Sequence, residues 1–336
     1  MAVLCPHAEA QTSDPIPPPP TRYAERLTYD PQTDQWVVTG RPVPGTEDGD
    51  LDIARQWMAR EDYETALRAV KAWIKTYGTG ASRYPEALYL QATAALGKGD
   101  YRLANETYQQ LLNEYPGSEF SERALSAQFR IAEQYLAGKK RKAFWGLLRV
   151  RDREQGVKIM DDIVANYADT PLAELAQKAK ADYYYARGDF ELAETEYATL
   201  AREFPRGRYH AYALLQSARS ALARYPGVDF DDASLLEAEE RFQQFQAQYP
   251  ALARQHNVPV VLEEIYAARA DKVYAIAEHY RKYRRPDAAR YYYRATLTRF
   301  PGTAAAAQAE LRLAALGIAP YEEMEVQPTT APEGGG

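Results

Sequence analysis

Apolar residues recur along most of this chain with the period of an amphipathic helix. In Tyr84–Ser118, Leu88 and Ala92 begin an apolar stripe with helical spacing. Two glycines end this helix, Asp100 can cap the next one, and a proline–glycine pair stops that helix after Tyr115. The segment therefore predicts an antiparallel helical hairpin.

The same plan recurs at fixed distances from the residue that ends each hairpin. A small residue precedes a large residue by one helical turn in six places: Ala66 and Val70, Ala104 and Tyr108, Gly156 and Met160, Ala193 and Tyr197, Ala238 and Phe242, and Ala289 and Tyr293. The small residue allows two helices to approach where they cross, and the large one fills the groove beside it. The pattern predicts paired helices throughout.

This register is similar to that of the tetratricopeptide (TPR) repeat, a helix pair of about 34 residues. The resemblance implies an all-α fold of tetratricopeptide-type helical hairpins, stacked in a right-handed superhelical solenoid. We expect about six repeats over residues 50–317. Residues 1–49 are expected to be disordered or turn-rich, and residues 318–336 to form a disordered tail.

An insertion at residues 138–153 interrupts the third repeat. It begins with four basic residues and continues into an aromatic pair: Lys139, Lys140, Arg141, Lys142, Phe144 and Trp145. Basic residues around apolar ones are typical of contact with an anionic membrane surface or an acidic partner. The alternative is an ordered loop that folds its apolar residues against the third repeat, and the sequence leaves both interpretations open.

The amino-terminal segment indicates export. Residues 8–10, Ala-Glu-Ala, have the small-x-small form of a signal cleavage site, so we expect a truncated export signal. The one cysteine, Cys5, is a candidate for lipid attachment, and an unprocessed tail is the third alternative. Trp36 lies further along and is expected to cover the open end of the first repeat.

Composition and charge exclude several classes of function. The 336 residues carry a formal net charge of -6, which argues against a general nucleic-acid binder. The four histidines lie far apart in sequence and have no metal-ligand or catalytic partner at a recognisable spacing. There is no glycine-rich phosphate loop. We therefore predict a protein that is not an enzyme and that holds no cofactor or metal.

The last third of the chain resembles the BamD (YfiO) family, the lipoprotein subunit of the outer-membrane β-barrel assembly machinery. The resemblance is carried by YAIAEHYRKYRRPDAARYYYRATLTRFPGTAAAAQAEL, from Tyr274 to Leu311. A second stretch, RDREQGVKIMDDIVANYADTPLAELAQ from Arg151, is similar to the third repeat of that family. The family position that faces the barrel-forming partner aligns with Tyr292, between Arg290 and Arg294.

The resemblance implies a non-enzymatic scaffold on the periplasmic side of the outer membrane. Its implied partners are a barrel-assembly protein, bound through Arg290, Arg294 and Tyr292, and unfolded or extended polypeptide. Peripheral membrane association is a separate expectation, which follows from the membrane interpretation of the basic insertion. The alternative is a generic TPR peptide- or protein-binding adaptor unrelated to barrel assembly. A cytoplasmic location follows if no export signal precedes the sequence.

Overall fold

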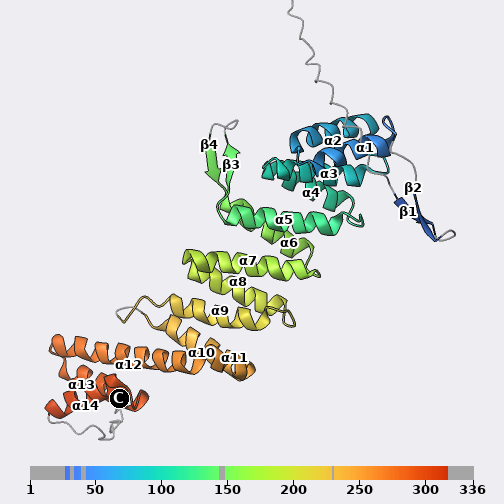
Figure 1. Cartoon of the computed structure of the whole chain (residues 1–336). Helices are drawn as coiled ribbons and strands as arrows, with labels where there is room; N and C mark the ends of the chain where they lie inside the picture. The colour runs from blue at the N-terminus through green and yellow to red at the C-terminus, as the bar shows by residue number, and fades with distance from the viewer. Residues whose placement is uncertain (1–26, 31–33, 39–42, 144–147, 229–230, 317–336) are drawn as a thin grey trace, which may run out of the picture. The chain divides into compact units, whose positions relative to one another are not determined.

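The computed structural model describes five stretches of the chain: residues 27–30, 34–38, 43–143, 148–228 and 231–316. Within them, helices follow one another along the sequence and two short β-hairpins stand apart (Figure 1). The chain divides into two compact units, Met1–Ala176 and Gln177–Gly336.

The first unit contains two strand pairs and the first helices. Its elements are β1 (Leu27–Asp30), β2 (Gln35–Val38), α1 (Glu47–Ala59), α2 (Tyr63–Tyr77), α3 (Tyr84–Gly97), α4 (Tyr101–Glu114), α5 (Ser121–Leu136), β3 (Lys140–Ala143), β4 (Leu148–Arg151) and α6 (Arg153–Asn166). Helix α7 (Pro171–Arg187) contains the boundary between the units. In each pair of strands the two are antiparallel.

The described part of the second unit is helical. Its elements are α8 (Phe190–Glu203), α9 (His210–Ala223), α10 (Ala233–Gln248), α11 (Pro250–Gln255), α12 (Val258–Lys282), α13 (Pro286–Arg299) and α14 (Ala304–Ala315). Helix α9 packs between α8 and α10, and α13 packs between α12 and α14. Each helix thus packs mainly on its neighbours in sequence, as repeat proteins do.

Local capping explains where the second helices of several hairpins begin. The side chains of Asp62, Asp100 and Asp152 each accept a hydrogen bond from the backbone N–H three residues ahead, at 3.1, 3.1 and 3.3 Å. These carboxylates satisfy N–H groups that have no partner within the helix and favour the positive end of its dipole. The cap predicted at Asp100 is therefore confirmed.

The small and large residues of the predicted register are buried. Gly156 and the small alanines at the other five positions are all buried, and the large residues Val70, Tyr108, Met160, Tyr197, Phe242 and Tyr293 are at most 1% exposed. A Cβ on Gly156 would lie 2.9 Å from the Ala132 carbonyl oxygen, so this crossing tolerates only glycine. The all-α class and the TPR-type helix pairs are confirmed.

The buried register tyrosines place their hydroxyls against polar groups of the preceding helix. Tyr108 Oη lies 2.9 Å from Thr93 Oγ1, and Tyr197 Oη donates to Asp182 Oδ1 at 2.6 Å. Tyr293 Oη donates to Glu278 in the same way. The two residues are 15 apart in all three pairs. Each tyrosine thus fills the groove with its ring and satisfies its hydroxyl, which a buried polar group requires.

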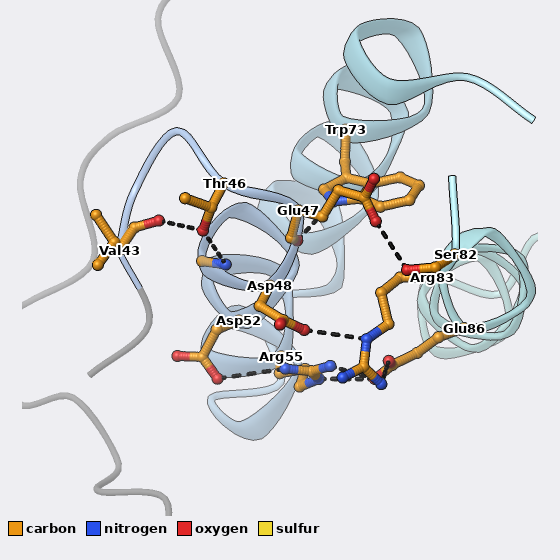
Figure 2. A network of polar contacts seen from close by, with 11 residues as sticks. Val43, Thr46, Glu47, Asp48, Asp52, Arg55, Trp73, Ser82, Arg83 and Glu86 are labelled. Atoms are coloured by element: carbon orange, nitrogen blue, oxygen red, sulfur yellow. Dashed lines mark hydrogen bonds and ion pairs between the residues drawn. The ribbon is translucent and has the colours of Figure 1, made fainter. Parts of the chain in front are cut away.

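Ion pairs connect the first two repeats at the start of the first unit (Figure 2). Arg55 on α1 donates from Nη2 to Glu86 Oε1 at 2.5 Å, and Arg83 Nε lies 3.0 Å from Asp48 Oδ1. The indole N–H of buried Trp73 donates to the carbonyl of Glu47 at 2.8 Å. These contacts fix α1 against α2 and α3.

Helix α1 begins at Glu47, three residues before the predicted start of the solenoid, and strands β1 and β2 lie in the segment expected to be disordered or turn-rich. The predicted domain boundaries stay a prediction. Strands β3 and β4 form a hairpin within the insertion at residues 138–153. Extra length in the later repeats takes the form of the short helix α11 and the 25 residues of α12.

Candidate protein-binding site

The described residues contain no cluster of histidine, cysteine, aspartate and glutamate side chains that could hold a metal ion. None of the helices in these stretches combines the length and the apolar character that crossing a bilayer requires. Exposed aromatic and charged side chains gather on two surfaces of the second unit.

One such surface lies at the turn between α12 and α13, where the chain reverses direction over three residues. Arg284 has a φ of 55°, a left-handed conformation that allows the tight reversal before Pro286 begins α13. We call this surface the C-terminal corner and define it as His279, Lys282, Tyr283, Arg284, Arg285 and Tyr291, all of which are exposed. Among the described residues, no carboxylate pairs with Lys282, Arg284 or Arg285.

Five aromatic rings run without a break across this corner. Tyr280 on α12 and Tyr292 on α13 stack with centroids 5.4 Å apart and an interplanar angle of 10°. His279 links Tyr280 to Tyr283, whose ring lies 4.6 Å from the imidazole, and Tyr291 packs edge-on to Tyr292. The two ends of the series, Tyr283 and Tyr291, are 63% and 46% exposed. Large rings that face solvent are typical of contact surfaces between proteins.

The structure separates the three residues predicted to bind the barrel protein. Arg290 and Arg294 are half-buried on α13, and the Nε atom of each is buried without a hydrogen-bond partner. Arg290 Nη2 lies 3.8 Å from Asp287, and Arg294 also has an interaction partner. Tyr292 is partly buried against the cluster around Tyr293. The more exposed ring beside them belongs to Tyr291.

Glu278 holds the helices behind the corner together. Its carboxylate accepts hydrogen bonds from Arg281 on α12, at 2.7 Å from Nη2, and from the hydroxyl of Tyr293 on α13. Arg312 on α14 lies 3.2 Å away. The hydrogen bond from Arg281 is the main cause that lowers the pKa of the Glu278 carboxyl below 4.5, with further lowering by Tyr293 against a rise from burial. A single carboxylate thus connects three helices.

Replacing Glu278 with glutamine is expected to lower the free energy of unfolding by about 1 kcal/mol at pH 7, because its arginine partners are half-exposed. The folded-state pKa lies below the unfolded value, so this contribution is present above pH 4.5 and is lost as pH falls through the folded pKa. Urea unfolding at about pH 7, 5, 4 and 3 measures this dependence. The free energies of unfolding of the variant and the wild type should converge in acid. Glu310→Gln, at an exposed site on α14, should match the wild type throughout.

A second surface is a hollow of about 550 Å³ between α8 and α10, with α9 at its base. Its lining is polar and of mixed charge, with Arg202, His210, Glu237 and Arg241 among the residues. Tyr249 Oη lies 2.7 Å from His210 Nδ1 and fixes that ring. The sequence predicts that extended polypeptide is a partner, and its binding surface stays a prediction.

Four of the remaining predicted residues, Lys139–Lys142, lie in or directly before strand β3. Lys139 is exposed with its Nζ 4.9 Å from the ring centroid of Tyr101, and Lys140, Arg141 and Lys142 form part of β3. Phe144, Trp145 and Cys5 lie outside the described residues. Both interpretations of the basic insertion therefore remain predictions.

Residues 146–328 match the family of outer membrane lipoproteins called YfiO, and residues 86–118 match a tetratricopeptide repeat family. The first match spans more than half of the 336 residues. The chain belongs to the YfiO family. Both matched families consist of non-enzymatic scaffolds that bind other proteins. No curated protein matches the sequence.

Three solved structures are similar to this member of the YfiO family. The C-terminal part of a TPR repeat-containing protein from Cytophaga hutchinsonii is 13% identical, with a TM-score of 0.38, and the match covers 79% of this chain and 88% of that chain. MamA from Desulfovibrio magneticus is 16% identical, with a TM-score of 0.31, and the match covers 60% of this chain and 93% of that chain. PilW, a type IV pilus biogenesis factor, is 15% identical, with a TM-score of 0.28, and the match covers 79% of this chain and 99% of that chain. These similarities concern the fold alone.

The YfiO match includes the whole C-terminal corner and the β4 strand, whereas Lys139–Lys142 precede it. The partner residues predicted from the sequence, Arg290, Arg294 and Tyr292, lie on α13, and that contact stays a prediction. Tyr283, Tyr291 and the cations of the turn were not singled out from the sequence. The signal for the cations is present in RKYRRPD, which has four basic residues within five positions directly before a proline. A turn so rich in cations is exposed because burial would remove the hydration of its charges.

Proposed function

We propose that this chain is a scaffold of the outer-membrane β-barrel assembly machinery, without enzymatic activity, on the periplasmic side of the outer membrane. Membership of the YfiO family supports the location. The observation that carries the partner contact is the C-terminal corner, where exposed rings and unpaired cations lie together within the matched residues. The partner is a periplasmic domain of a barrel-assembly protein with an acidic surface.

The composition of the corner suits such a contact. Tyrosine and arginine are enriched among residues that dominate binding energy, because they bury a large area and lose little conformational freedom. Tyr283 and Tyr291 supply the rings, and Lys282, Arg284 and Arg285 supply charge that would steer an acidic partner. Half-buried Arg290 and Arg294 lie one helical turn apart on α13 and support the same surface from its edge.

Two further parts of the proposal concern attachment and substrate. Cys5 is the site of lipid attachment, which the lipoprotein character of the family supports. The hollow between α8 and α10 receives unfolded or extended polypeptide, because its lining offers both hydrogen-bond donors and acceptors to a peptide backbone. The scaffold thus holds a partner subunit and a client segment on different surfaces of its second unit.

Charge reversal at the corner tests the proposal. Lys282→Glu with Arg285→Glu changes two exposed cations and leaves the left-handed Arg284 in place. We expect at least a roughly tenfold loss of the barrel-assembly protein that co-purifies from envelope extracts, because like charges would then oppose each other in the interface. Arg290→Glu with Arg294→Glu should reduce co-purification as well, and its circular dichroism must be checked because both side chains are half-buried.

The matched control is Lys71→Glu with Lys75→Glu, which changes the same charge at two exposed positions of α2. It should leave co-purification at the wild-type level. If the wild type recovers no barrel-assembly protein and its depletion leaves outer-membrane barrel levels normal, the assembly role is wrong. A generic TPR adaptor would then be the function that remains.

A further inference from the structure

The register of the β3–β4 hairpin places like charges opposite one another. Lys140 pairs with Arg151, and Lys142 pairs with Arg149. Cross-strand partners share a face of a two-stranded ribbon, and so do residues two apart on one strand. Positions 140, 142, 149 and 151 therefore lie on one face, and all four are basic. The opposite face holds Arg141, Ala143, Leu148 and Val150.

This arrangement opposes the stability of an isolated ribbon. Like charges directly opposite each other destabilise a strand pair, and a hairpin without further strands is marginal in water. The chain as a whole has a formal charge of -6, so four cations on one small face are a local reversal of its charge. An anionic surface against this face would convert both repulsive pairs into favourable contacts.

Helices of the second and third repeats hold the two ends of the hairpin. Before β3, Lys139 places its Nζ 4.9 Å from the ring centroid of Tyr101. After β4, Asp152 caps α6 by accepting a hydrogen bond from the Gln155 N–H at 3.3 Å. Figure 1 shows the two strands leading away from the helices between α5 and α6. The basic face is thus presented by a short ribbon anchored on helices, with no long linker on either side.

We propose that the basic face of the β3–β4 hairpin binds the headgroups of anionic phospholipids. The four positions form a two-by-two array, about 7 Å apart along each strand and about 5 Å apart across the pair. A membrane offers phosphates in two dimensions, as this array requires, whereas an acidic helix or strand offers carboxylates along a line. The inference rests on the membrane location proposed above, and it assigns the hairpin a contact separate from the C-terminal corner.

Vesicle binding by the purified full-length chain tests the proposal. The probe is vesicles of equal parts phosphatidylglycerol and phosphatidylcholine, compared with pure phosphatidylcholine, at low and high salt. We expect the wild type to prefer the anionic vesicles and to lose that preference in salt. Changing all four basic residues of the face to glutamine should weaken binding at least about tenfold. The control changes four exposed basic residues of the same unit to glutamine: Arg68, Lys71, Lys75 and Arg130.

A second variant removes the net positive charge of the face and stabilises the strand pairing of the hairpin. Arg149→Glu with Arg151→Glu places an acid opposite each lysine, so both cross-strand pairs become attractive. It should lose vesicle binding although its hairpin is stabilised, which separates loss of charge from loss of fold.

Three results would overturn the proposal: no preference of the wild type for anionic vesicles, equal losses in the control, or binding to polyglutamate without binding to vesicles, which would indicate an acidic protein partner. Co-purification with the barrel-assembly protein is measured separately with the corner variants. The lipid contact can therefore fail while the assembly role stands, and the reverse also holds.

Discussion

Replacing Phe242 with alanine is expected to lower the free energy of unfolding by about 3–5 kcal/mol. Phe242 is 1% exposed and occupies the large-residue position of the fifth repeat on α10. Its ring belongs to a cluster that includes Leu215, Ala218 and Phe245. Alanine would remove these contacts and leave a cavity that the neighbouring helices can fill only in part. Urea unfolding followed by circular dichroism measures the loss.

Tyr291→Ala is the matched comparison, since it removes an exposed ring from a helix of the same unit. It should change the free energy of unfolding by less than about 0.5 kcal/mol. A loss at Tyr291 as large as the loss at Phe242 would mean that the register does not distinguish core positions from surface positions.

Replacing Glu194 with alanine is expected to cost about 3 kcal/mol, at the lower end of the range for breaking a buried ion pair. Glu194 on α8 is 5% exposed, and its two oxygens lie 2.6 Å from Arg224 Nη1 and 2.6 Å from Arg241 Nη2. Burial raises the pKa of this carboxyl, while Arg224 opposes the rise. Without Glu194, Glu237 would be the remaining carboxylate partner of both guanidinium groups among the described residues, and Arg241 would keep its hydrogen bond to Ser217.

The control is Glu203→Ala on the same helix, where an exposed carboxylate lies 3.0 Å from Arg202. Exposed pairs contribute at most about 1 kcal/mol, so thermal unfolding should show a much smaller shift. If the two variants melt together, the buried network does not connect α8, α9 and α10 as the distances indicate.

The sequence was sufficient to locate the core of each helix pair. Ala104 and Tyr108 could be identified because burial follows the helical period, and their spacing repeats in five other places. The start of a helix could also be predicted from the sequence, because a carboxylate that precedes an apolar stripe, such as Asp100 before α4, caps the helix. These features depend on residues near each other in sequence, which is why one sequence reveals them.

Contacts between repeats could not be predicted from the sequence in the same way. Glu194 meets Arg224 and Arg241 across 30 and 47 residues, and no local pattern marks the three as partners. At the candidate site, the stacking of Tyr292 on Tyr280 depends on how far each of two helices is rotated about its axis. A difference of one residue in that rotation decides whether Tyr291 or Tyr292 faces solvent, and sequence spacing alone does not determine it.

The packing of each helix on its neighbours in sequence has a kinetic consequence. In α9 packed on α8, or α13 on α12, the contacting residues are close along the chain, so little loop entropy opposes their meeting. Chains rich in such local contacts fold quickly, and folding can begin in any hairpin and spread to the next. A chain that emerges amino end first can therefore bury the apolar face of one hairpin before the following hairpin is complete, which shortens the time for which that face is open to aggregation.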